Sequence, residues 1–319
     1  MRVPTFAAAR TSGGQAATQR PERMADEGAA PLGRSKAPER GRKSYRAAVC
    51  EHTPVGSVGV DGAAMDVARR NMELYRAAAG WAAGGGEGNK DGGTGGGAQI
   101  IVYPEWGLLG ASDAVSRRDR MVPFAQPVGD AGDDLLAQPS GGEYSIVREL
   151  ASIAKDCGIV VVANVCEKAA DAADAALPVY YNTEVAISED GILLAKYHKM
   201  HPFFTRTFDR PQEREVVTFE TSFGVRFGLF ICKDLCHSEP QRSLLDGSRA
   251  HGGATQIPFS VAAPHTFLVR WFYRRWSEKR GATLLASNRG GGGGIFAGGK
   301  GGKSHVVKRH GCTVATIHL

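Results

Sequence analysis

The sequence has no apolar run long enough to cross a membrane, and its N-terminus has no continuous apolar segment like that of a secretory signal. The first residues are rich in arginine and alanine, and the first acidic residue is Glu22. We therefore expect an intracellular protein. A transit peptide within residues 1–43 remains an open alternative to a plain disordered tail.

Cysteine is sparse and irregularly spaced. The six cysteines are Cys50, Cys157, Cys166, Cys232, Cys236 and Cys312. A chain of 319 residues can bury a large core without disulfide bonds, so we predict that the thiols are mostly reduced. Cys232 and Cys236 have the spacing of two zinc ligands, but there is no second such pair. We therefore expect no metal site.

Two common catalytic motifs are also missing. There is no G-x-S-x-G segment, which argues against a serine hydrolase. The segment GGKGGKS ends like a phosphate-binding loop, but the required first glycine is replaced by Ala297. The formal charge of +6 is mildly basic, and we attribute it to the surface and not to a nucleic-acid partner.

Residues 1–43 show no apolar periodicity and are predicted to be a disordered tail, so the folded domain is expected to span residues 44–319. Glycine-rich insertions are expected near residues 83–97 and 290–302. Strands are predicted in the apolar runs around residues 44–52, 98–105, 159–165, 223–232 and 282–288, with an Asp-Gly hairpin across residues 183–199.

Three amphipathic helices are predicted between these strands. The first follows Asp61 as its N-cap, the second ends at Gly158, and the third runs from Pro264 to Gly281. In the third, we expect the aromatic side chains to lie in the core and the arginines in solvent; a nucleic-acid-binding face is the alternative. Mixed helices and strands, with most strands apolar on both faces, predict an α/β or layered α+β fold.

Three groups that suit catalysis lie at the ends of predicted strands. They are Glu105, Lys199 and Cys232. Taken singly, each has an ordinary explanation as a solvated loop residue or a small core residue. Together, a carboxylate could accept the thiol proton, and an ammonium could lower the thiol pKa and stabilise an oxyanion. The backbone N–H of Lys233 would then be a second oxyanion donor.

The sequence around these residues resembles a known family. YPEWGLLG, LLAKYHKMHPFF and GLFICKDLCHSEP are similar to the three catalytic blocks of the nitrilase superfamily, or carbon–nitrogen hydrolases. The biotinidase and vanin (pantetheinase) branch is the most similar, and the resemblance covers roughly residues 45–310. It implies a four-layer αββα sandwich, with Glu105 as general base, Lys199 as electrostatic stabiliser and Cys232 as nucleophile.

The resemblance also implies hydrolysis of a small-molecule amide through a thioester, with no cofactor and no metal, in a homodimer. Trp106, His201 and Thr205 are the candidates for substrate binding. Two positions depart from the family pattern: Thr205 replaces a second glutamate, and Lys233 replaces an aromatic residue. A catalytically weak or inactive protein that keeps the fold for binding or assembly is therefore the alternative.

Overall fold

The computed structural model describes residues 44–59, 62–84, 97–111, 113–137, 145–169, 178–247, 253–264, 267–298, 303–309 and 311–319. These residues all belong to one compact unit, Ala37–Leu319. The predicted tail, residues 1–43, lies outside the described residues. So do Asp61 and parts of both glycine-rich insertions.

The described strands form two sheets. The larger sheet has the order β11 (Lys303–Arg309), β12 (Cys312–His318), β1 (Ser44–Cys50), β2 (Ile100–Val102), β3 (Val160–Lys168), β4 (Tyr180–Ile187) and β5 (Leu193–His198). The smaller sheet has the order β10 (Gly294–Phe296), β9 (Thr283–Asn288), β8 (Gln256–Val261), β7 (Arg226–Gly228) and β6 (Thr218–Glu220).

Each sheet has a parallel centre and antiparallel edges. In the larger sheet β1, β2 and β3 are parallel, while β3, β4 and β5 alternate in direction. In the smaller sheet β7, β8 and β9 are parallel. The carboxyl ends of parallel strands meet at one edge of a sheet, so residues that follow β1, β2 and β3 emerge together.

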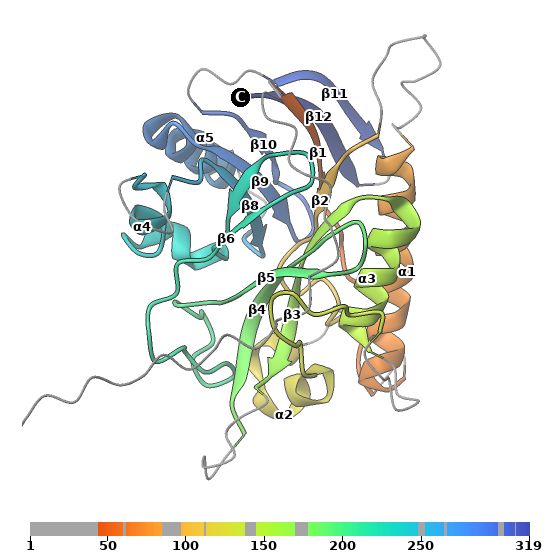
Figure 1. The fold of residues 1–319 in the computed structure, drawn as a ribbon. Helices are drawn as coiled ribbons and strands as arrows, with labels where there is room; N and C mark the ends of the chain where they lie inside the picture. The colour runs from red at the N-terminus through yellow and green to blue at the C-terminus, as the bar shows by residue number, and fades with distance from the viewer. Residues whose placement is uncertain are drawn as a thin grey trace, which may run out of the picture. The chain divides into compact units, whose positions relative to one another are not determined.

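Helices cover the outer faces of the two sheets, which gives the predicted four-layer αββα sandwich (Figure 1). On one side lie α1 (Ala64–Ala83) and α3 (Ile146–Cys157), and on the other lie α4 (Gln241–Leu245) and α5 (Phe267–Arg280). The short helix α2 (Arg118–Met121) lies in the connection between β2 and α3.

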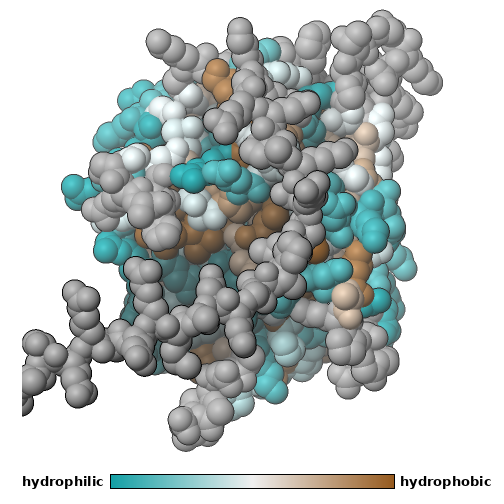
Figure 2. Space-filling view, in the orientation of Figure 1, coloured by the Kyte–Doolittle hydropathy of each residue, from teal (hydrophilic) through white to brown (hydrophobic). Residues whose placement is uncertain are grey.

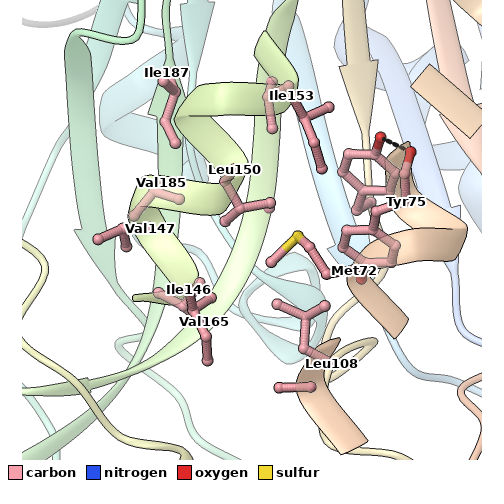
Figure 3. Packing of buried hydrophobic residues seen from close by; sticks show 14 of the residues in the cluster. Met72, Tyr75, Leu108, Ile146, Val147, Leu150, Ile153, Val165, Val185 and Ile187 are labelled. Carbon is pink, nitrogen blue, oxygen red and sulfur yellow. Dashed lines mark hydrogen bonds between the residues drawn. The ribbon is translucent and has the colours of Figure 1, made fainter. Parts of the chain in front are cut away.

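The outer core of the larger sheet joins α1 and α3 to the strands below them (Figure 3). Leu150 of α3 and Met72 of α1 are buried in it with Val185 of β4. Strand side chains alternate between faces, so the neighbours of Val185 in sequence, Glu184 and Ala186, face the space between the two sheets. The buried hydrophobic residues of that inner layer include Tyr197.

The predicted ends of two elements are confirmed. Gly158 follows α3 with a φ of 60°, a left-handed value that glycine adopts without strain. The Asp-Gly hairpin joins β4 and β5. The predicted cap of α1 is wrong, because the helix starts after Ala63 and not after Asp61. The Asp66 carboxylate accepts the backbone N–H of Ala63 and so supplies the missing cap.

The predicted burial of aromatic residues in α5 is only half right. Tyr273 and Trp276 are buried against the smaller sheet, but Phe267, Trp271 and Phe272 are exposed. Tyr273 and Trp276 are three positions apart, so the helix touches the sheet along one narrow stripe. The other aromatic side chains of α5 lie outside this contact with the sheet and stay exposed.

The visible face of the molecule carries mostly hydrophilic side chains, with hydrophobic ones gathered across its middle (Figure 2). Within the described part of the chain, no helix has the length and hydropathy needed to cross a membrane.

Candidate active site

Glu105 lies in a strained loop just beyond β2, and its side chain is fully buried. The next residue, Trp106, has a φ of 58°, a left-handed value that costs a non-glycine residue about 1–2 kcal/mol. Gly107 follows because any Cβ there would lie 1.9 Å from the Tyr75 hydroxyl. The loop therefore fixes the direction from which Glu105 enters the interior.

Lys199 comes directly after β5, and its side chain reaches Glu105. Lys199 Nζ lies 2.5 Å from Glu105 Oε1, and both side chains are shielded from water. The ammonium also lies 5.5 Å from the centre of the Trp106 ring. Burial alone would lower the pKa of Lys199, but the charge and hydrogen bond of Glu105, together with the charges of Cys232 and Asp234, outweigh burial and raise that pKa. The lysine is therefore held as an ammonium.

Two asparagines on the inner face of the larger sheet hold the carboxylate in place. Asn182 Nδ2 donates to Glu105 Oε1 at 2.7 Å, and Asn164 Nδ2 donates to Asn182 Oδ1 at 2.6 Å. Asn164 Oδ1 in turn accepts the backbone N–H of Trp106 at 3.0 Å. The strained loop and the carboxylate are thus tied to β3 and β4 by one chain of hydrogen bonds.

The second oxygen of Glu105 is the one left open for chemistry. Oε2 is buried and receives no hydrogen bond from the nitrogen and oxygen donors of the described residues. An unsatisfied buried carboxylate oxygen is costly, and such atoms often mark a functional role. This oxygen is the natural acceptor for a proton delivered inside the site.

Cys232 begins a short 3₁₀ helix, Cys232–Cys236, in the segment that follows β7. Its φ of 45° is left-handed, so the nucleophile candidate, like Trp106 beside Glu105, sits on a strained turn. Asp234 secures this turn, because its Oδ2 accepts the backbone N–H of Ile231 at 3.1 Å.

The environment keeps the Cys232 thiol protonated. Burial and the Glu105 carboxylate raise the pKa of Cys232 to about 12, although the Lys199 ammonium and the backbone N–H of Ala262 act in the opposite direction. The sequence predicted that Lys199 would lower this pKa. It does so, but the lowering is smaller than the combined effect of burial and Glu105.

Residues 63–261 match the family model described as Carbon-nitrogen hydrolase. This chain belongs to the carbon–nitrogen hydrolase family. It is 33% identical over 201 residues to a pantetheinase from Canis lupus familiaris and 32% identical over 206 residues to a biotinidase from Takifugu rubripes. Each alignment covers 60% of this chain, but only 38% and 39% of the two relatives. The chain thus spans about two fifths of the length of these curated relatives.

Solved structures support the fold of this carbon–nitrogen hydrolase. A mutant of the Nesterenkonia AN1 amidase from the nitrilase superfamily aligns with a TM-score of 0.53 and 18% identity, covering 87% of this chain and 92% of the other. Saccharomyces cerevisiae Nit3, a nitrilase superfamily member, aligns with a TM-score of 0.55 and 17% identity, covering 86% and 90%. At these identities the likeness concerns the fold alone.

Asp234 organises the other side of the carbon–nitrogen hydrolase site. It is fully buried, and its Oδ1 accepts both the backbone N–H and Nδ1–H of His201, at 2.9 and 2.8 Å. Its Oδ2 accepts the Tyr197 hydroxyl at 2.8 Å. Asp234 therefore joins the turn of Cys232 to the segment that carries Lys199.

The predicted substrate-binding residues occupy different settings. Trp106 is buried and packs near Phe204, with ring centres 5.6 Å apart. His201 is half-buried, bonded to Asp234 and stacked on His237 at 3.7 Å. Thr205 is exposed. A role for each in substrate binding stays a prediction.

Lys233, the other residue that departs from the family pattern, places its ammonium near the Phe203 ring. Lys233 Nζ lies 5.8 Å from the centre of the exposed Phe203 ring. Its backbone follows Cys232 at the first turn of the 3₁₀ helix, where the predicted second oxyanion donor would lie. The six cysteines are all free thiols.

The sequence did not identify Asn164, Asn182 or Asp234. Each of the two asparagines interrupts an apolar strand, which was a usable signal, because a polar residue on an inner face needs a partner. Asp234 had no such signal, because a carboxylate two residues after a candidate nucleophile usually lies in solvent.

His198, which precedes Lys199, is an imidazolium held between two carboxylates. Its Nε2 lies 2.8 Å from Glu167 Oε2, and its Nδ1 lies 2.6 Å from Glu215 Oε1. Burial would lower the pKa of His198, but the hydrogen bonds and charges of Glu167 and Glu215 raise it to about 9. The two bonds tie the end of β5 to β3 through Glu167 and to the loop that follows Lys199 through Glu215.

This histidine predicts a loss of stability at alkaline pH. The folded-state pKa of about 9 lies above the ordinary histidine value of 6.5, so the stabilisation is complete below pH 6.5 and lost as pH rises through 9. We expect His198→Gln to cost roughly 3 kcal/mol in the free energy of unfolding at pH 6, and progressively less toward pH 10. Urea unfolding at several pH values measures this difference, and a difference that does not change with pH would contradict the prediction.

Proposed function

We propose that this protein hydrolyses the C–N bond of a small linear amide through a thioester on Cys232. The observation that carries the proposal is the buried Lys199–Glu105 pair beside Cys232, with Glu105 Oε2 left without a nitrogen or oxygen donor among the described residues. Membership of the carbon–nitrogen hydrolase family supports it. The relatives named pantetheinase and biotinidase support a substrate in which the amide joins a small acid to an amine.

In the first half of the proposed reaction, the Cys232 thiol gives its proton to Glu105 Oε2 as sulfur attacks the amide carbonyl carbon. Proton transfer is coupled to attack, because a thiol with a pKa near 12 does not ionise on its own at neutral pH. The Lys199 ammonium and the backbone N–H of Lys233 stabilise the oxyanion that forms. The C–N bond then breaks, and the leaving amine takes the proton from Glu105.

The second half reverses these roles with water as the nucleophile. Glu105 takes a proton from water as its oxygen attacks the thioester carbonyl, and the C–S bond breaks when the tetrahedral intermediate collapses. The proton returns from Glu105 to sulfur, and the carboxylic acid leaves. No metal or organic cofactor takes part in these proposed steps.

The acyl intermediate gives the test. Incubation with pantetheine and with a biotin amide should produce a Cys232 acyl adduct in an intact mass spectrum, together with release of free amine. The adduct and turnover should both be absent in Cys232→Ala. In Glu105→Gln the new side chain can still accept the hydrogen bond from Asn182, but it cannot accept a proton from the thiol. We expect this variant to lower kcat by roughly 10²–10⁴-fold.

Cys236→Ala is the matched control, because this exposed thiol lies four residues from Cys232 in the same 3₁₀ helix. It should leave both the adduct and the turnover unchanged. If a broad amide panel gives neither adduct nor amine while the protein is folded, the alternative of an inactive binding or assembly protein replaces the proposal.

We also propose that a second copy of the chain, and not nucleic acid, covers the outer face of α5. The helix exposes Phe267, Leu268, Trp271 and Phe272, with exposed fractions of 80%, 71%, 52% and 39%. Positions separated by four residues lie on one face of a helix, so these side chains form a contiguous apolar surface. A surface of this kind is typical of a protein interface.

The oligomeric state tests this surface. We expect the wild-type protein to sediment as a dimer and the double variant Leu268→Glu, Trp271→Glu to sediment as a monomer, because two carboxylates would have to be desolvated in the interface. Leu74→Glu, at an exposed leucine of α1 with a similar exposed fraction of 42%, should remain dimeric. A monomeric wild-type protein, or one that binds RNA through α5, would exclude the dimer.

A further inference from the structure

A second buried glutamate lies outside the three proposed catalytic residues. Glu184 of β4 is fully buried, on the same inner face as Asn182. Its Oε1 is 2.5 Å from the Ser260 hydroxyl of β8, in the opposite sheet. The same hydroxyl is 2.6 Å from the carbonyl oxygen of Tyr103, two residues before Glu105.

The two short contacts need two protons, but Ser260 has only one. A serine hydroxyl donates a single hydrogen bond, and a backbone carbonyl donates none. If Glu184 were a carboxylate, one of the two oxygen–oxygen contacts would join two acceptors with no proton between them. A protonated Glu184 removes the conflict: it donates to Ser260 Oγ, and Ser260 donates to Tyr103.

The charges around Glu184 agree with this count of protons. Burial raises the pKa of Glu184 well above its usual value, and the nearby charge of Glu105 adds to the effect, whereas Ser260, Asn164 and Lys199 oppose it. Lys199 already pairs with Glu105 at 2.5 Å. The titratable groups that face or neighbour Glu184 are Glu105, Lys199, Tyr75, Tyr103 and Tyr197.

We propose that Glu184 is held as a neutral carboxylic acid, and that its chain of hydrogen bonds through Ser260 to Tyr103 is a positioning device for Glu105. The chain links β4, β8 and the loop after β2, so it fixes the base of that loop between the two sheets. A neutral Glu184 also leaves Lys199 with a single carboxylate partner. The positioning role rests on the proposed function, whereas the protonation of Glu184 does not.

Glu184→Gln tests the protonation without any substrate. A glutamine amide can donate to Ser260 in place of the acid, so the fold and both contacts are kept. The wild-type chain must hold a proton on Glu184 when folded but releases it when unfolded above pH 4.5. The folding equilibrium constant of the wild type should therefore fall relative to that of the variant by about tenfold for each pH unit above 5.5, until Glu184 ionises in the folded protein.

Urea unfolding of both proteins between pH 5 and 8 measures this ratio, and the contribution of His198 cancels because both proteins contain it. An infrared difference spectrum should also show a protonated carboxyl band that is absent in Glu184→Gln. Parallel stability curves with no such band would mean that Glu184 is ionised and would overturn the proposal.

The positioning role needs a variant that fills the same space but cannot donate. We expect Glu184→Leu to lower kcat by about 10–100-fold with little change in KM, since a small displacement of a catalytic group has an effect of this size. Glu184→Gln should retain the wild-type kcat. A residue that only stabilises the fold is not expected to lower kcat without changing KM. Nor would the amide of Glu184→Gln be expected to restore kcat.

A second readout does not depend on turnover. Thiolate absorbance follows the ionisation of Cys232, whose pKa Glu105 helps to raise. If Glu105 is displaced in Glu184→Leu, Cys232 should ionise at lower pH than in the wild type, and Glu184→Gln should match the wild type. An unchanged Cys232 titration in a folded Glu184→Leu protein would exclude positioning. Absence of turnover in every protein would instead count against the proposed function.

Discussion

Lys199 and Glu105 carry opposite charges 2.5 Å apart in a place that water does not reach. Removing two charges from water costs several kcal/mol per ion, and the attraction between them offsets this only when geometry is good and the remaining polar atoms are satisfied. The surroundings meet this condition for one oxygen of Glu105 only. Asn182 and Lys199 both donate to Oε1, while Oε2 has no nitrogen or oxygen donor among the described residues.

The same pair explains why a thiol with a high pKa is compatible with catalysis. A carboxylate fixed beside Cys232 disfavours a resting thiolate, so the nucleophile is stored as a neutral thiol. In the proposed mechanism, the carboxylate that raises the pKa is also the base that removes the proton when a carbonyl carbon is in place. Lys199 would then balance the charge that moves from sulfur to the substrate oxygen.

The sequence was informative wherever local chemistry decides the structure. Gly158 could be placed at the end of α3 and the Asp-Gly hairpin between β4 and β5, because single residues set these conformations. A layered fold followed from the mixture of helices and apolar strands, and the four layers followed from the family resemblance. Glu105, Lys199 and Cys232 could be named because each follows an apolar run.

What the sequence could not give depends on partners far along the chain. In the folded sheet, Asn164 donates to Asn182, and Asn182 donates to Glu105. Ser260 contacts Glu184 across the space between the two sheets. The exposed aromatics of α5 were predicted to be buried, since the sequence alone does not show how narrow the contact between this helix and the sheet is.

The dependence of Cys232 on Glu105 is open to one direct measurement. Thiolate absorbance, taken as the difference between each protein and its Cys232→Ser counterpart, reports the ionisation of this cysteine alone. We expect no Cys232 thiolate in the wild type up to pH 10, and a clear shift of its titration to lower pH in Glu105→Gln, where the opposing charge is gone. A wild-type thiol that ionises near the ordinary value of about 8.5, unchanged by Glu105→Gln, would contradict the central role of the buried carboxylate.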